Sequence, residues 1–171
     1  MTTEPIRTER LMLRSTRESD GEFCLSMWLD DEMGKYLSDP PRELADEAEL
    51  NFAVGIEKDE GWYPFVVELN ETGQLIGSCS MVPEGDGVTW DMGYCVHKDY
   101  WRQGYATEMI RALISWGCDR GGRSFTAAVA KENVGSNAVL RKLGFHIEKT
   151  GKFKKRLTDI VYDEYVYRLD I

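Results

Sequence analysis

The sequence has little of what metal centres, disulfide scaffolds and membrane spans require. It contains four cysteines and two histidines, and no two cysteines form a CxxC pair. This spacing predicts neither a zinc site nor a disulfide framework, and it is typical of free thiols in a reducing cytoplasm. No apolar run approaches the ~18 residues of a membrane span, and Met1 to Arg14 lack the apolar core of a signal peptide. We therefore expect a soluble cytoplasmic protein without metal and without membrane contact.

Cationic charge is also scarce. The chain has 30 Asp and Glu against 21 Lys and Arg, a net charge of −9, which argues against a nucleic-acid partner. The imbalance is uneven, because residues 1–90 carry a net charge of −13 and residues 91–171 a net charge of +4. The first part could attract a cation and the second a polyanion, although an unevenly decorated surface explains the same charges.

Hydrophobic residues make up 42% of the 171 residues, which is enough for one core and predicts a single domain over residues 1–171. Apolar runs bounded by turn residues predict strands at residues 11–13, 62–69, 74–82, 88–96, 124–129, from 145 and at 160–169. Apolar residues at helical spacing predict helices after Ser19 or Asp20 and at residues 43–57, 104–120 and 133–143. The order of these elements predicts one mixed α/β sheet with helices on its faces.

The strand at residues 88–96 leads through a short loop into the helix that begins at Gly104. The first amides of a helix lack internal partners and carry partial positive charge, so they can bind a diphosphate where no side chain blocks the approach. Gly104 and Ala106 keep this turn open, although tight packing would also explain two small residues. Neither a Walker motif nor a GxGxxG dinucleotide motif is present.

Several segments together resemble one family. WRQGYATE at residues 101–108 resembles the Q/RxxGxG/A signature of GCN5-related N-acetyltransferases, with Trp101 at a position that is usually Gln or Arg. RTERLMLR, YLSDPP and KENVGSNAVLRKLGF are similar to the ribosomal-protein N-acetyltransferase branch of that superfamily. The resemblance implies a mixed, mostly antiparallel sheet of six or seven strands with a central, splayed parallel pair. It also implies an acetyl-CoA-dependent N-acetyltransferase that acts by direct attack in a ternary complex.

The resemblance further implies where acetyl-CoA binds. Backbone groups of Cys95 and Val96 would pair with the pantetheine arm, and Asn133, Ser136 and Asn137 would face the arm from the other side. Arg102, Arg141 and Lys142 are candidates for the 3'-phosphate, although exposed solubilising cations are an alternative. The diphosphate would bind the amides of Arg102, Gln103, Gly104, Tyr105, Ala106 and Thr107.

Two candidate catalytic residues follow from the same resemblance. Asp91 stands where several family members carry a glutamate base, and its shorter side chain would require a bridging water. Ser136 stands where this branch places a serine near the thioester sulfur, with a helix cap as its competing role. Leu140 replaces the tyrosine that many relatives use as acid, which excludes a tyrosine acid at that position. We interpret His97 as a loop residue, and we expect a backbone amide near Val96 to make the oxyanion contact.

The resemblance also implies that the acceptor is a primary amine. A lysine-like amine with a pKa of ~10.4 costs about 4.6 kcal/mol to deprotonate at pH 7, and an α-amine with a pKa of ~7.8 about 1 kcal/mol. A protein N-terminal α-amine or a small-molecule amine of modest pKa is therefore favoured. Trp28, Tyr36 and Trp62, interleaved with acidic residues, are the candidate acceptor-binding residues. The non-enzymatic alternative is an acyl-CoA-binding regulatory module, and the final strand could exchange with a neighbour in a homodimer.

Overall fold

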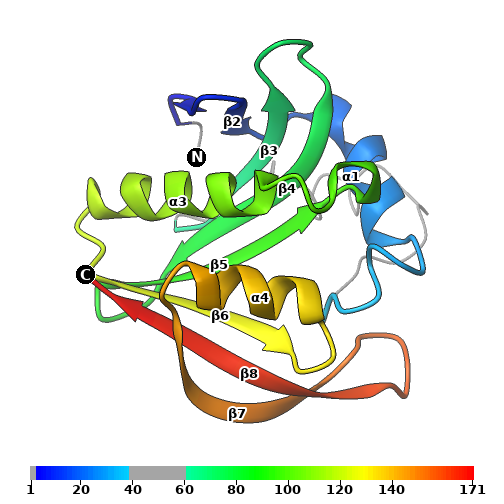
Figure 1. Ribbon diagram of the computed structural model, residues 1–171, viewed down its shortest axis with the longest axis vertical. Helices are drawn as coiled ribbons and strands as arrows, with labels where there is room; N and C mark the ends of the chain where they lie inside the picture. Colours follow the sequence, from blue (N-terminus) through cyan, green and yellow to red (C-terminus); the bar gives the residue numbers. More distant parts are fainter. Residues whose placement is uncertain (1–2, 39–60) are drawn as a thin grey trace.

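The structure is a computed structural model, in which residues 3–38 and 61–171 are described. The helix expected at residues 43–57 lies outside the described residues. The strands form one sheet in the order β1-β2-β3-β4-β5-β6-β8-β7 (Figure 1). Every neighbouring pair is antiparallel except β5 and β6. Their bounds are β1 Ile6–Arg7, β2 Leu11–Ser15, β3 Tyr63–Leu69, β4 Leu75–Pro83, β5 Thr89–Val96, β6 Ser124–Ala130, β7 His146–Lys154 and β8 Val161–Asp170.

The mixed, mostly antiparallel sheet with a central parallel pair is confirmed. The described residues contain eight strands, whereas the family resemblance implied six or seven. The additional strand, β1, has two residues and pairs at the edge of the sheet with β2. A strand of that length is too short to leave an alternating pattern in the sequence.

Helices cover both faces of the sheet. The described helices are α1 Gly21–Trp28, α3 Tyr105–Cys118 and α4 Val134–Lys142, with short 3-10 turns η1 Glu18–Asp20 and η2 Lys98–Tyr100. Phe65 and Val67 of β3 belong to the large core cluster under α3, whereas Val66 packs with Cys24 of α1. Because successive side chains of a strand point to opposite faces, α1 lies on the face opposite α3 and α4.

Local chemistry sets the helix ends that border the site. Gly104 precedes α3 with a φ of 82°, a left-handed conformation that a residue with a Cβ adopts only under strain. The Asn133 side chain accepts a hydrogen bond from the Ser136 amide at 3.3 Å and so caps α4. Gly144, with a φ of 91°, follows α4 as expected for a helix stop.

The parallel pair is short. β5 and β6 pair only between Thr89–Asp91 and Ser124–Thr126. Beyond these residues β5 stays paired with β4 as far as Val96, and β6 stays paired with β8 as far as Ala130. The two strands therefore separate into a gap between residues 92–96 and 127–130, called the fork below.

Two further observations concern membrane-spanning helices and the reactivity of the cysteine thiols. In residues 3–38 and 61–171, no helix has the length and apolar character needed to cross a membrane. All four cysteines are free, and burial raises the pKa of the Cys24 and Cys95 thiols to about 12. These thiols are therefore protonated and poor nucleophiles.

Candidate active site

The loop before α3 presents a row of free amides. Arg102 and Gly104 both have left-handed backbone, with φ of 61° and 82°. Within the described residues, no acceptor meets the amides of residues 102–107, and the Glu108 amide is the first to bond back to Gly104. Free amides at a helix N-terminus favour a bound anion, so this loop fits a diphosphate. A Cβ at Gly104 would add bulk and backbone strain at this turn.

The pairing register shows which backbone groups of β5 face the fork. The His97 amide bonds to the Ile76 carbonyl, and in an antiparallel ladder only alternate residues bond to a given neighbour. Cys95 therefore bonds toward β4, and its carbonyl oxygen lies 2.6 Å from where a Cβ of Gly77 would be. Tyr94 and Val96 turn their backbone groups toward the fork.

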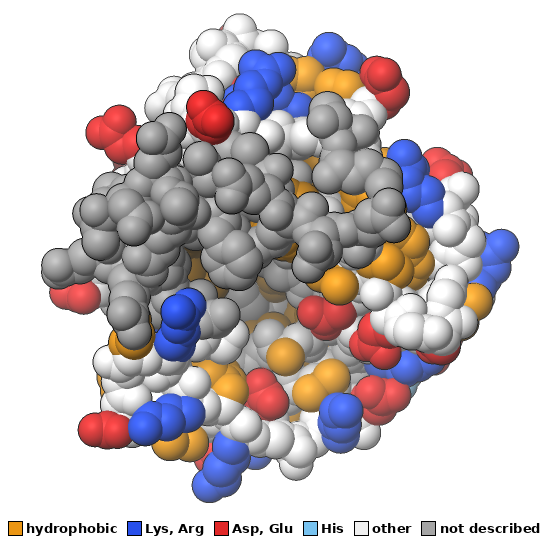
Figure 2. Space-filling model, turned by 180° about the vertical axis from the view of Figure 1, so that it is seen from behind, with side chains coloured by type: hydrophobic (Ala, Val, Ile, Leu, Met, Phe, Trp, Pro, Cys, Tyr) orange, Lys and Arg blue, Asp and Glu red, His pale blue; other side chains and the backbone are white. Residues whose placement is uncertain are grey.

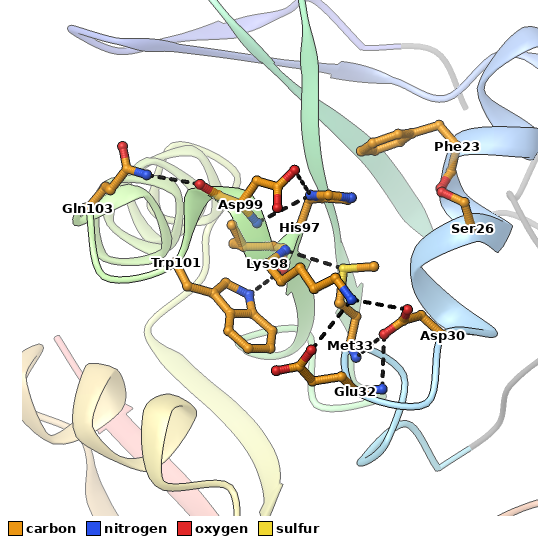
Figure 3. Close-up of polar contacts among 11 residues, drawn as sticks. Phe23, Ser26, Asp30, Glu32, Met33, His97, Lys98, Asp99, Trp101 and Gln103 are labelled. Atoms are coloured by element: carbon orange, nitrogen blue, oxygen red, sulfur yellow. Dashed lines mark hydrogen bonds and ion pairs between the residues drawn. The ribbon is translucent and has the colours of Figure 1, made fainter.

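This register corrects the expectation for Cys95 and restricts the one for Val96. Cys95 has its backbone groups engaged with β4 and is not a free partner for a pantetheine arm. The Val96 carbonyl accepts a hydrogen bond from the Trp101 indole at 2.6 Å (Figure 3). The Val96 amide and both backbone groups of Tyr94 are the partners that remain.

Asp91 lies where β5 and β6 separate, as the last β5 residue that pairs with β6. The residue as a whole keeps contact with solvent, but protein atoms pack around its carboxyl. Their partial desolvation of the carboxyl, together with the negative charge of Glu84, raises its pKa. Hydrogen bonds from the Thr126 hydroxyl, at 2.9 Å, and from the Met92 amide oppose that shift. A carboxylate with a raised pKa at the base of a fork is suited to accept a proton.

Ser136 and Asn137 lie in the first turn of α4, where they have different surroundings. Ser136 is half-buried, with its amide bonded to the Asn133 cap. Asn137 is buried, and its amide nitrogen donates to the carbonyls of Ala130 and Asn133 at 3.0 and 2.7 Å. The Tyr167 hydroxyl donates to the Asn137 oxygen at 2.7 Å. Asn137 therefore holds the turn between β6 and α4 together, and its expected role as a cofactor contact stays a prediction.

Tyr94 is a candidate that the sequence reasoning missed. Its hydroxyl is fully buried, and no described group meets it at hydrogen-bond geometry. Burial raises the pKa of Tyr94 to about 12, and the nearby Ser136 hydroxyl lowers it in part. A buried hydroxyl without a well-aligned partner is unusual in a folded protein, and here it approaches the residue expected to meet the thioester sulfur. The only signal in the sequence was a tyrosine on the strand before the signature.

The loop after α1 is fastened to the turn between β5 and α3 (Figure 3). The Lys98 ammonium lies 3.4 Å from the carboxylates of both Asp30 and Glu32, and the Lys98 amide donates to the Met33 sulfur at 3.2 Å. Asp30 also accepts the amides of Glu32 and Met33, each at 2.9 Å. These contacts link the α1 side of the sheet to the loop that precedes the free amides.

Trp28, Tyr36 and Trp62, the expected acceptor-binding residues, are all half-buried and occupy separate places. The Trp28 indole donates to the Ser78 hydroxyl at 3.2 Å on the α1 face. The Tyr36 hydroxyl reaches the Glu132 carbonyl at 3.3 Å, and its ring packs edge-on against Tyr162 with 5.3 Å between centroids. Tyr36 therefore lies at the open end of the fork, and Trp62 precedes β3.

The β7–β8 hairpin completes this side of the site. The Lys155 ammonium donates to the carbonyls of Gly34 and Lys35 at 2.8 and 3.1 Å, and burial lowers its pKa. The Arg156 amide donates to the Ser38 carbonyl at 2.8 Å. Acidic, basic and hydrophobic side chains are interspersed on the described part of the face seen in Figure 2. No group of three or more His, Cys, Asp or Glu in the described part of the chain could hold a metal ion.

Comparison with known families decides the identity of this arrangement. The acetyltransferase (GNAT) domain family matches residues 10–146, most of the chain. The chain belongs to the GNAT acetyltransferase family. The GNAT match spans the amide loop, the fork, Asp91 and Ser136 together.

Known proteins similar to this GNAT domain include N-acetyltransferases and solved acetyltransferase structures. The N-acetyltransferase p20 of Bacillus licheniformis is 26% identical over 173 residues, which cover 97% of this chain and 96% of that protein. A GNAT-family acetyltransferase from Bacillus anthracis superposes with a TM-score of 0.79 at 25% identity, covering 98% of both chains. RimL, a ribosomal L7/L12 α-N-protein acetyltransferase solved in complex with coenzyme A, superposes with a TM-score of 0.82 at 21% identity, also covering 98% of both chains.

The protein is therefore an acetyl-CoA-dependent N-acetyltransferase, as the sequence predicted. The residues present fit the coenzyme, because a row of free amides leads to a fork with unpaired backbone groups.

Proposed function

We propose that this enzyme transfers the acetyl group of acetyl-CoA directly to an α-amine, on a peptide N-terminus or a small molecule, within a ternary complex. The observation that carries the proposal is Asp91, a crowded carboxylate with a raised pKa at the base of the fork. The diphosphate would bind the amides of residues 102–107, and the pantetheine arm would lie in the fork against Tyr94 and Val96.

The proposed reaction needs the residues around the fork for two proton transfers. Asp91, through a bridging water, would accept a proton from the ammonium form of the acceptor and release the neutral amine for attack. The amine nitrogen would attack the thioester carbon, and collapse of the tetrahedral intermediate would break the carbon–sulfur bond and expel the CoA thiolate. In the second transfer, the proton that remains on the attacking nitrogen would pass to the thiolate sulfur, which leaves the neutral amide and the CoA thiol. The Ser136 hydroxyl would donate a hydrogen bond to that thiolate as it departs.

The preference for an α-amine rests on the energy of deprotonation. One carboxylate that acts through water is a modest base, and an α-amine requires only about 1 kcal/mol at pH 7, compared with about 4.6 kcal/mol for a lysine side chain. The loop after α1 carries the carboxylates of Asp30 and Glu32, whose negative charge would suit a cationic acceptor. RimL, a structural neighbour, is a ribosomal L7/L12 α-N-protein acetyltransferase.

The experiment compares acceptors whose amines differ in pKa and size. Initial rates would be measured with acetyl-CoA and peptides that have a free N-terminus, the same peptides with a blocked N-terminus and an internal lysine, free amino acids, and polyamines. Acetylation of the free α-amines and none of the lysine side chains supports the proposal. Turnover restricted to lysine side chains or polyamines would refute it.

A further inference from the structure

The segment that precedes β2 is fastened to the first turn of α3. The Glu108 carboxylate accepts three hydrogen bonds, from the Thr8 hydroxyl at 2.6 Å, the Arg10 amide at 2.9 Å and the Arg10 Nε at 2.7 Å. Burial raises the pKa of Glu108, but these hydrogen bonds outweigh it and hold the pKa below its usual range. Glu108 is therefore ionised, and its charge is neutralised by Arg10.

Arg10 also touches the amide loop itself. Its Nη1 donates to the Gln103 carbonyl at 2.9 Å, and its guanidinium lies 4.3 Å from the centre of the Tyr105 ring. Its Nη2 lies 3.4 Å from where a Cβ of Gly104 would be. One side chain thus contacts Gln103 and Tyr105 and lies beside Gly104 between them. In Figure 1 the N-terminal strands lie beside α3, which brings Arg10 to this position.

The amide loop needs such support because its conformation is disfavoured locally. The backbone of Arg102 is left-handed, with a φ of 61°, which is uncommon for a residue with a Cβ. Such a conformation persists where surrounding contacts hold it in place. The contact of Arg10 with the Gln103 carbonyl fixes the peptide that lies between the two left-handed residues, Arg102 and Gly104.

Charge gives a second reason for the contact. Glu108 is an acidic residue in the first turn of α3, close to the amides that would bind a diphosphate. An uncompensated carboxylate there would repel an anion, because like charges within a few ångströms disfavour binding. The Arg10 guanidinium neutralises that charge through its bond to Glu108, and its Nη1 also donates to the Gln103 carbonyl of the loop.

We propose that Thr8, Arg10 and Glu108 form a brace that positions the diphosphate-binding loop for coenzyme A. The three are positioning residues, because they act through the backbone of residues 102–105. The inference rests on the proposed diphosphate site. Loss of the brace would weaken coenzyme binding more than it slows the chemical step.

The test measures CoA affinity by titration calorimetry for the wild type and for Arg10→Ala. One lost charge-assisted hydrogen bond predicts an affinity about tenfold lower or worse, with KM for acetyl-CoA rising and kcat little affected. The matched control is Arg7→Ala, which removes the same charge from an exposed side chain lining the same cavity of about 740 Å³. Adding Glu108→Gln to Arg10→Ala removes the uncompensated carboxylate and should recover part of the lost affinity.

The remaining variants separate the brace from folding and from the diphosphate site. Arg10→Lys keeps the charge but cannot make both contacts, so its affinity should be intermediate, and its thermal unfolding should match the wild type. Equal losses of CoA affinity in Arg7→Ala and Arg10→Ala would overturn the brace, because net charge alone would then explain the loss. Wild-type affinity in Arg10→Ala, together with lost binding in Gly104→Val, would overturn the brace and leave the diphosphate site standing. Wild-type affinity in Gly104→Val would instead reject the diphosphate site.

Discussion

Replacing Asp91 with asparagine tests the proposed base with little change in shape. Asparagine has nearly the same volume, and its oxygen can still accept the hydrogen bond that the Thr126 hydroxyl now donates at 2.9 Å. The substitution therefore removes the proton acceptor while leaving the base of the fork intact. Binding of CoA, which would occur along residues 92–107, should be unaffected.

The expected loss of rate follows from the energy of the amine. At pH 7 an α-amine with a pKa of ~7.8 is neutral in roughly one molecule in seven, so pre-equilibrium ionisation alone leaves a sizeable reactive fraction. General base catalysis contributes about 10²- to 10⁴-fold. For this class of acceptor we expect kcat/KM of Asp91→Asn to fall roughly 10- to 100-fold at pH 7. The deficit should shrink above pH 8, where the free amine predominates.

Two measurements accompany the rates. The acidic limb of the wild-type pH profile should report Asp91, and Thr126→Val should move it to higher pH because it removes a hydrogen bond that lowers the pKa of Asp91. Since folding raises the pKa of this carboxyl, its ionisation opposes folding at neutral pH, and Asp91→Asn should unfold at a higher temperature at pH 7. Below the pKa of an unfolded aspartate, about 3.9, that difference should vanish. A kcat/KM equal to that of the wild type across the pH range would refute Asp91 as the base.

Three other predictions concern the fork and the fold. Tyr94→Phe should lower kcat about tenfold with unchanged CoA affinity, and most of that effect should disappear in a Ser136→Ala background if Tyr94 acts through Ser136, as a double-mutant cycle would report. Arg14→Ala should lower the free energy of unfolding by about 3–5 kcal/mol in denaturant titrations. The buried Arg14 guanidinium donates to both carboxylate oxygens of the buried Asp20 at 2.8 Å, and the substitution leaves that carboxylate without its ion-pair partner. Hydrogen exchange should slow at the Val96 amide when CoA binds and stay constant at Cys95, which bonds to β4 in either state.

The sequence predicted those parts of the site that depend on neighbouring residues. A glycine before a helix, an asparagine cap three residues before Ser136 and a glycine after α4 each act through local backbone geometry, and all three were located correctly. The mixed sheet was also recognised, because alternating and unbroken apolar runs follow directly from which faces of the strands are buried.

The features that the sequence did not predict depend on contacts between segments that are far apart in the sequence. Arg10 meets Glu108 from 98 residues away in the sequence, and no periodicity encodes that pairing. No feature of the sequence shows that Tyr167 and the Ala130 carbonyl engage both ends of the Asn137 amide. The role of Tyr94 became visible only when the divergence of β5 and β6 placed its hydroxyl beside α4.

The separation of β5 and β6 at the fork can be understood from what a closed sheet would exclude. A sheet that closed between residues 92–96 and 127–130 would satisfy every backbone group and leave no room for a pantetheine arm. Here the carbonyls at the open end are capped by side chains, Val96 by Trp101 and Ala130 by Asn137, while the register turns the deeper backbone groups of Tyr94 toward the fork. Leaving backbone groups unpaired costs stability unless a ligand or water bonds to them. The coenzyme would thus take the place of the missing strand. The amides of its pantetheine arm would bond to those backbone groups in the fork that no side chain caps.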